Sequence, residues 1–390
     1  ADVTENRVSD GRLDTTNYQT FGAELTNRTE IELGVPIRLT FGAEFYQDQQ
    51  EATRNGVPRV QAPDATAQYA AVFAQGDIEL TETLTLTPGV RFDYFSLDPS
   101  GAFQDRSDSE ISPKLALQWR PTDSVQLWVS ASQSFRAPSL TELYVTGTHF
   151  SVGAPFPIFF PAGVPFGTIF SGNNVFLPTP DLKPERANQI EIGGRLDDRD
   201  VMFDGDRLIF SANGYYARVD DYVDTVVTFI DPSTFVPGAF GAPGTVNGST
   251  VNRNVDANLW GFEAEVTYDA ADFFLGAGVT IPRGGQRDGA QLGSIPQDRI
   301  TLTGGFRPID DLEIGARATL MSGQKRTAST PTSGTALFDL FATWTPTTGA
   351  LDGAFVSAGI DNLTDRTYRI HGNGLNQPGI AFKASAGIEF

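Results

Sequence analysis

The chain has 390 residues, with 28 lysines and arginines against 48 aspartates and glutamates, which gives a formal net charge of −20. This balance leaves no basic face to neutralise phosphates and argues against nucleic acid as a partner, and the absence of cysteine excludes disulfides and thiolate metal sites. Hydrophobic residues make up 40% of the chain but form no run long enough for a transmembrane helix.

A period of two runs along the chain from its first predicted strand, at about 16–33, to its end. In GFEAEVTYDA, Phe262 and Val266 alternate with Glu263 and Glu265, which places the two sets on opposite faces of a strand. DLEIGARATL and the closing FKASAGIEF repeat the pattern. About fifteen such segments, each roughly ten residues or longer, are predicted as strands.

The connections between these strands alternate between two kinds. Short connections lie at 34–36, 82–84, 122–124, 269–272 and 308–310. Long, irregular connections lie at about 51–66, 98–107, 135–184, 228–253, 282–297 and 364–377. Short turns on one side and long loops on the other are typical of an all-β, antiparallel transmembrane β-barrel. A soluble β-solenoid or a long sandwich is the alternative, and neither has a reason to alternate so regularly.

A barrel assigns a role to both strand faces. Lipid on the outside explains the uncharged face, and a wet or plugged lumen explains the polar one. We expect four charged side chains to face the lumen, namely Glu263, Glu265, Arg317 and Asp339. Aromatic residues near strand ends fit an interfacial girdle, although ordinary strand packing is an equal alternative; they are Trp119, Tyr268 and Trp344.

Strand parity makes a further prediction. If the last strand, ending at Phe390, finishes at the periplasm, the strand at 16–33 runs inward from the outside. Single-chain bacterial barrels normally have an even number of strands. Fifteen strands that start outside therefore predict that residues 1–390 are one barrel domain, truncated at its N-terminus. Its two free edges would be unpaired in lipid, so alone it should misassemble unless it curls into a smaller closed form.

Residues 356–390 read VSAGIDNLTDRTYRIHGNGLNQPGIAFKASAGIEF, which resembles the end of TonB-dependent outer-membrane receptors. The matching positions are Asn362, Leu363, Thr364, Asp365, Tyr368, Pro378, Gly379 and Phe390. The terminal aromatic Phe390 also resembles the signal read by the barrel assembly machinery. The resemblance implies a 22-stranded barrel in outer-membrane lipid, closed by an N-terminal plug, of which this chain would supply strands 8 to 22. It also implies transport driven by the TonB complex through that plug.

Two boxes around the predicted loop 135–184 are similar to those of the haem and haemoglobin receptor branch. The first box is Phe135, Arg136, Ala137 and Pro138; the second is Thr179, Pro180, Asp181 and Leu182, followed by Lys183, Pro184 and Glu185. Thr179 and Asp181 stand where the branch has asparagine. The resemblance implies capture of haem, either free or from a haemoprotein. A ferric siderophore or another scarce nutrient is the alternative ligand, and a passive pore or assembly scaffold is the alternative class.

His149, one of two histidines in the chain, follows the first box. A neutral imidazole is a good ligand for haem iron, so we predict His149 as an axial ligand, with an ordinary surface histidine as the alternative. Phenylalanines of the same loop would surround a flat apolar ring or pack the loop on itself; they are Phe150, Phe156, Phe159, Phe160, Phe166, Phe170 and Phe176. The resemblance implies a second axial ligand on the plug.

Other loop residues are alternative candidates for haem contact or for anchoring the loop. His371 is a candidate auxiliary haem contact, although an ordinary loop histidine is favoured. Tyr144 is a fallback oxygen ligand that is more expected to pack at the strand end. Arg136 and Glu142 are expected to pair and fix the base of the loop, with haem propionates as the alternative partner of Arg136. Three residues are expected to anchor the far side of the loop, namely Lys183, Glu185 and Arg186.

No motif in the sequence indicates catalysis. The segment GGQRDG at 284–289 does not lie between a strand and a helix as a phosphate loop would. There is no G-x-S-x-G elbow, and the two histidines lie too far apart in sequence for an HExxH-type zinc site. We therefore expect no enzyme and no catalytic cofactor, with haem as the transported ligand.

Overall fold

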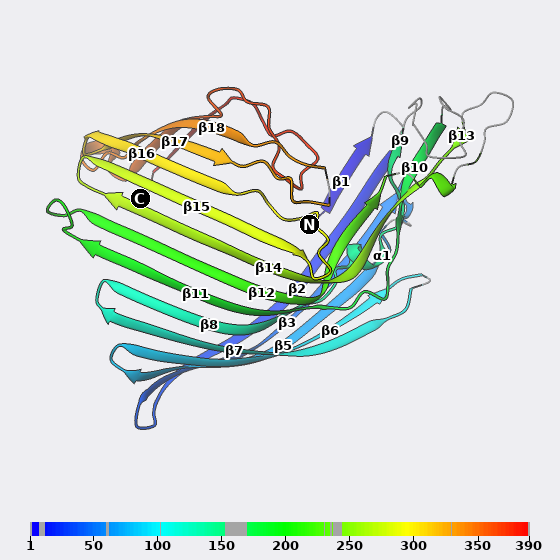
Figure 1. Ribbon diagram of the computed structural model, residues 1–390, viewed down its shortest axis with the longest axis horizontal. Helices are drawn as coiled ribbons and strands as arrows, with labels where there is room; N and C mark the ends of the chain where they lie inside the picture. Colours follow the sequence, from blue (N-terminus) through cyan, green and yellow to red (C-terminus); the bar gives the residue numbers. More distant parts are fainter. Residues whose placement is uncertain are drawn as a thin grey trace.

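The computed structural model describes residues 2–7, 12–59, 62–101, 103–152, 170–229, 231–234, 236, 244–328 and 330–388. Within these ranges the strands join into one 20-stranded sheet that curls around a hollow interior (Figure 1). The predicted all-β, antiparallel architecture is confirmed. Along the described ranges, no helix has the length and apolar character needed to cross a membrane.

Fifteen strands form the wall of the sheet, which matches the predicted number. They are β2 (Arg12–Glu32), β3 (Pro36–Arg54), β5 (Ala65–Thr81), β6 (Leu84–Pro99), β7 (Arg106–Thr122), β8 (Val125–Arg136), β11 (Glu185–Arg199), β12 (Arg207–Thr228), β14 (Gly248–Asp269), β15 (Phe273–Gln286), β16 (Arg299–Ile309), β17 (Leu312–Met321), β18 (Thr335–Trp344), β19 (Ala354–Asp361) and β20 (Ala381–Ile388). The shorter elements are β1 (Asp2–Arg7), β4 (Val57–Pro58), α1 (Leu140–Tyr144), β9 (Gly147–Val152), β10 (Phe170–Leu177), β13 (Gly244–Thr245) and two 3-10 turns, Pro232–Thr234 and Gly349–Leu351.

The period of two determines which side chains face outward. Large apolar side chains on one face of the wall are exposed, for example Phe262 on β14 and Leu275 on β15. The alternate residues Glu263 and Glu265 line a hollow with polar neighbours. An apolar surface of this extent is unfavourable in water and favourable against lipid.

Short turns and long loops lie at opposite ends of the wall, as expected (Figure 1, left and right). The short-turn end also carries connections at 200–206 and 345–353, and the long-loop end carries a connection at 322–334; none of the three was anticipated from the sequence. Because β2 and β20 are the first and fifteenth antiparallel wall strands, both run from the long-loop end to the short-turn end. The direction predicted for the first strand is confirmed.

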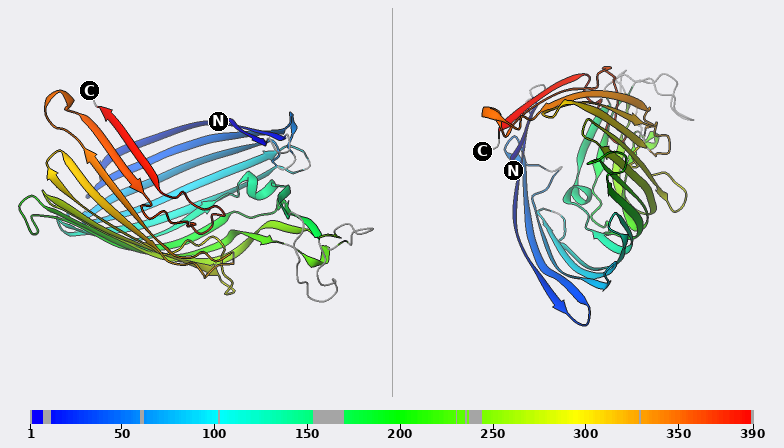
Figure 2. Two further views of the ribbon diagram at one scale, coloured as in Figure 1. Left: turned by 90° about the horizontal axis from the view of Figure 1, so that it is seen from above. Right: turned by 90° about the vertical axis from the view of Figure 1, so that its left-hand side faces the viewer.

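Viewed along the hollow, the wall is a curved ring with β1 and β2 at one end and β20 at the other (Figure 2, right). Among the described residues, β20 pairs with β19, and β2 pairs with β1 and β3. The expectation that further strands and a plug precede this segment stays a prediction. Phe390, the expected assembly signal, lies outside the described residues.

The largest buried cluster lies at the long-loop end, where the β8–β11 connection folds into the mouth of the ring (Figure 2, right). Its members are Ala67, Phe95, Leu97, Leu143, Tyr144, Leu182 and Val223. Phe135 packs against the cluster, and its ring centroid lies 5.8 Å from that of Phe95. Burial of apolar side chains from the wall, from α1 and from Leu182 fixes the base of the long connection.

Candidate ligand-binding site

The short helix α1 begins where the sequence supplies a capping box. The Ser139 hydroxyl accepts a hydrogen bond from the Glu142 amide at 3.2 Å, and the Glu142 carboxylate accepts one from the Ser139 amide at 2.8 Å. Two backbone donors that would otherwise lack partners are thereby satisfied. The helix turns Leu143 and Tyr144 into the buried cluster, so the chain after the first box is anchored to the wall.

Arg136 joins three segments at the base of this loop. Its guanidinium donates to Glu142 at 2.9 and 3.1 Å and to Glu185 at 2.8 and 2.6 Å. Glu185 also accepts a hydrogen bond from the Val223 amide at 2.8 Å. Burial alone would raise the pKa of Glu142, but hydrogen bonds from Arg136 and Ser139 outweigh it and leave the pKa below its usual value. The expected charge pairing is present, and most Arg136 donors are already engaged.

The second box closes the far side of α1. The Thr179 amide donates to the Leu143 carbonyl at 2.8 Å, and its hydroxyl donates to the Glu142 carbonyl at 3.2 Å. The Pro180 carbonyl accepts from Arg106 at 3.0 Å, and the Lys183 amide donates to the Asn254 side chain at 2.7 Å. Threonine, although it departs from the expected asparagine, therefore caps the carbonyl end of this helix.

Arg186 does not anchor the loop as expected. Its guanidinium donates to Glu110 on β7 at 2.6 Å, so it links β11 to β7. The Lys183 ammonium lies 3.7 Å from the Asp221 carboxylate, on the β12 side of the loop base. Of the three predicted far-side anchors, Glu185 holds the base through Arg136, and Lys183 holds it through its backbone and its ion pair.

His149 occupies an irregular point of the β9–β10 ladder. Asn174 pairs with Phe150 and Val175 pairs with Thr148, so His149 is the extra residue of a β-bulge. Bulges redirect a side chain out of the regular alternation. His149 is exposed, and its ring lies 4.3 Å from Phe176 and 4.9 Å from Phe150, measured between centroids.

A hydrogen-bond chain fixes the proton of the His149 ring. The Asn174 amide nitrogen donates to the Thr228 carbonyl at 2.9 Å, which leaves its oxygen to accept from the Thr250 hydroxyl at 2.5 Å. Thr250 has one proton, so its oxygen accepts from His149 Nδ1 at 2.9 Å. The imidazole is thus protonated on Nδ1, and Nε2 carries the lone pair that a metal ion needs.

His149 and Phe176 line a cavity of about 330 Å³ between the loop base and the ends of β2 and β3. The volume lies in the range of small-molecule sites. Arg54 and Arg59 also line it, although their sequence neighbourhood contains no motif that would have marked them. Of the loop phenylalanines, Phe156, Phe159, Phe160 and Phe166 lie outside the described residues, as does the side chain of Phe170.

Neither fallback ligand presents a free donor atom. Tyr144 is 1% exposed, its ring packs 4.8 Å from that of Phe103, and burial raises the pKa of its hydroxyl. His371 is 7% exposed; its Nε2 donates to the Gly293 carbonyl at 3.1 Å, and its Nδ1 lies 2.9 Å from the Thr332 hydroxyl. Both side chains serve loop packing in this conformation, as the favoured alternatives expected.

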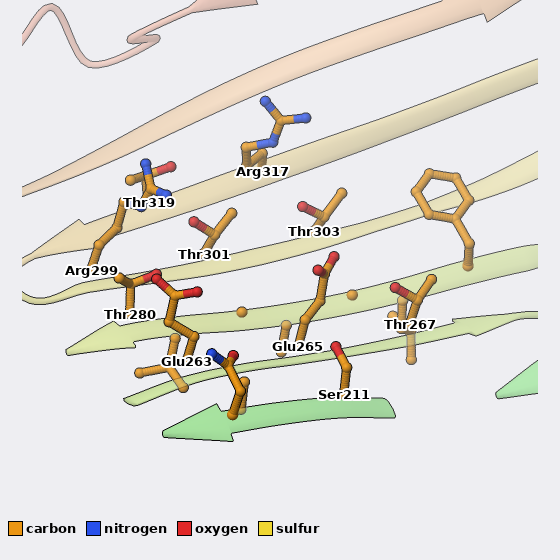
Figure 3. Close-up of a pocket in the computed structure, with 18 residues that line it drawn as sticks. Ser211, Glu263, Glu265, Thr267, Thr280, Arg299, Thr301, Thr303, Arg317 and Thr319 are labelled. Carbon is orange, nitrogen blue, oxygen red and sulfur yellow. The ribbon is translucent and has the colours of Figure 1, made fainter. Parts of the chain in front are cut away.

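A second hollow, of about 640 Å³, lies on the lumen face of β14–β17. Figure 3 shows Glu263, Glu265, Arg299 and Arg317 on that face, surrounded by threonine and serine hydroxyls. Asp339 stands opposite Arg317 in the β17–β18 ladder and accepts the Asn362 amide at 2.8 Å. The lumen is polar as expected. Over the described ranges, no group of three or more histidine or acidic side chains could hold a metal ion.

A family model described as "TonB dependent receptor-like, beta-barrel" matches residues 2–363. The hemin receptor of Yersinia enterocolitica is 31% identical over 299 residues, which cover 75% of this chain and 40% of that protein. The heme/hemopexin utilization protein C of Haemophilus influenzae is 26% identical over 382 residues, which cover 94% of this chain and 50% of that protein. The chain therefore spans about half the length of the curated relatives that it matches.

Solved structures agree on the fold. The hemophore receptor HasR of Serratia marcescens, in a complex with its hemophore HasA and heme, superposes with a TM-score of 0.72 and 21% identity over 97% of this chain and 60% of that one. The copper transporter OprC gives a TM-score of 0.71 and 19% identity over 97% of this chain and 58% of that one. At these identities the likeness concerns the barrel alone.

Proposed function

The chain belongs to the TonB-dependent receptor-like β-barrel family, and we propose that it forms the ligand-capturing wall of a receptor for haem uptake. Barrels of this family lie in the outer membrane, and their members are receptors and transporters rather than enzymes. Relatives named hemin receptor and heme/hemopexin utilization protein C support haem as the cargo. The proposed source of the haem is either free haem or a haemoprotein.

The observation that carries the proposal is the hydrogen bond between His149 Nδ1 and the Thr250 hydroxyl. The Nδ1–H of His149 is held by Thr250, which is held in turn by Asn174, so Nε2 is left as an iron-binding atom on an exposed bulge. The adjacent rings of Phe176 and Phe150 offer apolar faces to a flat macrocycle. Capture at this position precedes passage through the lumen, which we propose is driven by the TonB complex. Assembly by the barrel machinery and contact of the wall with lipid belong to the same proposal.

A haem titration followed by visible absorbance tests this function. The full-length protein is refolded in detergent as wild type, His149→Ala and His371→Gln, the last being a control that keeps hydrogen bonding at the buried histidine. We expect the Soret band of haem to shift with the wild type and with His371→Gln, and to weaken or move with His149→Ala.

The other outcomes separate the parts of the proposal. Unchanged binding by His149→Ala would keep haem as the cargo and remove His149 as its ligand. Absence of binding by the wild type would contradict haem uptake and leave a ferric siderophore as the next candidate cargo.

A further inference from the structure

We propose that Arg59, beside Arg54, binds a carboxylate group of the same ligand whose iron His149 holds. The proposal rests on the proposed haem function and deepens it, since it assigns the residue that would recognise the acidic side chains of the macrocycle. Haem carries two propionate groups at one edge, and a site for it needs an apolar wall, an iron ligand and cationic partners for those propionates.

Arg59 and His149 come together only in the folded chain. Arg59 follows β4 in the β3–β5 connection, whereas His149 lies on β9 in the β8–β11 connection. Both line the cavity of about 330 Å³, together with Phe176 and Leu140. A ligand in this cavity therefore meets an iron-binding nitrogen, an aromatic ring and a guanidinium group.

The Arg59 guanidinium is poorly satisfied among the described residues. Its Nε is buried and has no hydrogen-bond partner there, although guanidinium groups carry five N–H donors. Its Nη2 lies 3.7 Å from the Asp14 carboxylate, which is too long for a hydrogen bond. Buried donors in native proteins nearly always have an acceptor, so this group indicates a missing one.

The charge of the cavity wall agrees with this interpretation. Asp14, which is 3% exposed, accepts from Arg54 through both oxygens, at 2.7 and 3.0 Å. One carboxylate therefore faces two guanidinium groups, and its better geometry is with Arg54. A planar carboxylate would match the guanidinium donors of Arg59.

Titrations with two porphyrins test the proposal. Ferric protoporphyrin IX and its dimethyl ester, which lacks the carboxylates, are titrated by absorbance into the full-length protein as wild type, Arg59→Gln and Arg253→Gln. Arg253 is the matched control, because it also has a 3.7 Å ion pair, with Asp224, but does not line this cavity. Arg59→Lys is a second variant that keeps the charge without the planar donor group.

We expect Arg59→Gln to weaken binding of the free acid on the order of 10- to 100-fold and to leave binding of the ester unchanged. The affinity of Arg59→Lys for the free acid should lie between those of the wild type and Arg59→Gln. Arg253→Gln should bind both porphyrins as the wild type does. Equal losses for acid and ester, or no loss for either, would overturn the role of Arg59 while haem binding by the wild type keeps the proposed function. If the wild type binds neither porphyrin, both proposals fall.

Discussion

Replacement of Arg136 by alanine should release α1 from the base of the long loop without unfolding the barrel. The guanidinium donates four hydrogen bonds to Glu142 and Glu185. Its side chain is 45% exposed, but that of Glu185 is only 14% exposed. Exposed ion pairs contribute about 0–1 kcal/mol, whereas removing one partner of a buried pair costs about 3–5 kcal/mol.

The exposures place Arg136 between these limits, so we expect a loss of about 2 kcal/mol for local opening of the loop base. That corresponds to roughly a 30-fold increase in the opened population. In Arg136→Ala, the carboxylates of Glu142 and Glu185 also lose the cation between them, and this loss further favours opening of the loop base. Most of the buried cluster is untouched, so the wall strands should keep their protection.

Hydrogen exchange measured by mass spectrometry on the refolded full-length protein can detect this change. Peptides covering 139–145 should exchange roughly 30-fold faster in Arg136→Ala, while peptides from β16 and β17 exchange as in the wild type. Arg38→Ala is the control, because Arg38 lies 3.6 Å from Glu30 and both side chains are exposed. Exchange of 139–145 within twofold of wild type would refute the clamp, and faster exchange everywhere would show a global effect instead.

Three further predictions concern other contacts. Thr250→Val removes the acceptor of His149 Nδ1 and should weaken haem binding by about 10- to 100-fold in absorbance titrations, whereas Thr225→Val, on the neighbouring strand, should not. Leu143→Ala, at a fully buried position, should cost about 2–5 kcal/mol of local stability, measured by protease susceptibility of the loop base; unchanged cleavage would contradict its packing role. Burial would raise the pKa of Asp206, but hydrogen bonds from Tyr268 and backbone amides outweigh it and lower the pKa to about 2. The 200–206 turn should therefore keep the full stabilisation from the Asp206 carboxylate above about pH 4 and lose it as the pH falls through 2. A rate of proteolysis of this turn that changes between pH 5 and 7 would contradict this prediction.

Much of the fold was predictable because its signals are local. Alternation in GFEAEVTYDA already separates Phe262 from Glu263, since successive side chains of a strand point to opposite faces. Short connections such as 34–36 needed only chain order to be recognised. The β17–β18 loop at 322–334 was missed although its sequence, SGQKRTASTPTSG, has the polar, glycine- and proline-containing composition of a loop.

The site was predictable only in part. The sequence marked the first box and His149 as candidates, and the charge pairing of Arg136 followed from the residue types. Arg59 was missed, because an arginine in a loop has no distinguishing pattern until a cavity forms around it. The assignment of Arg186 to the loop was wrong, because its strand register turns it toward Glu110.

The sequence by itself determined the barrel, its direction and the position of His149, because backbone alternation and motif spacing act over a few residues. Only the tertiary structure decided what His149 can do. Its partner Thr250 lies 101 residues further along the chain, and Thr250 reaches back 76 residues to Asn174. The proton position depends on three side chains whose distances exist only after β9, β10 and β14 have packed, and no local pattern encodes such distances.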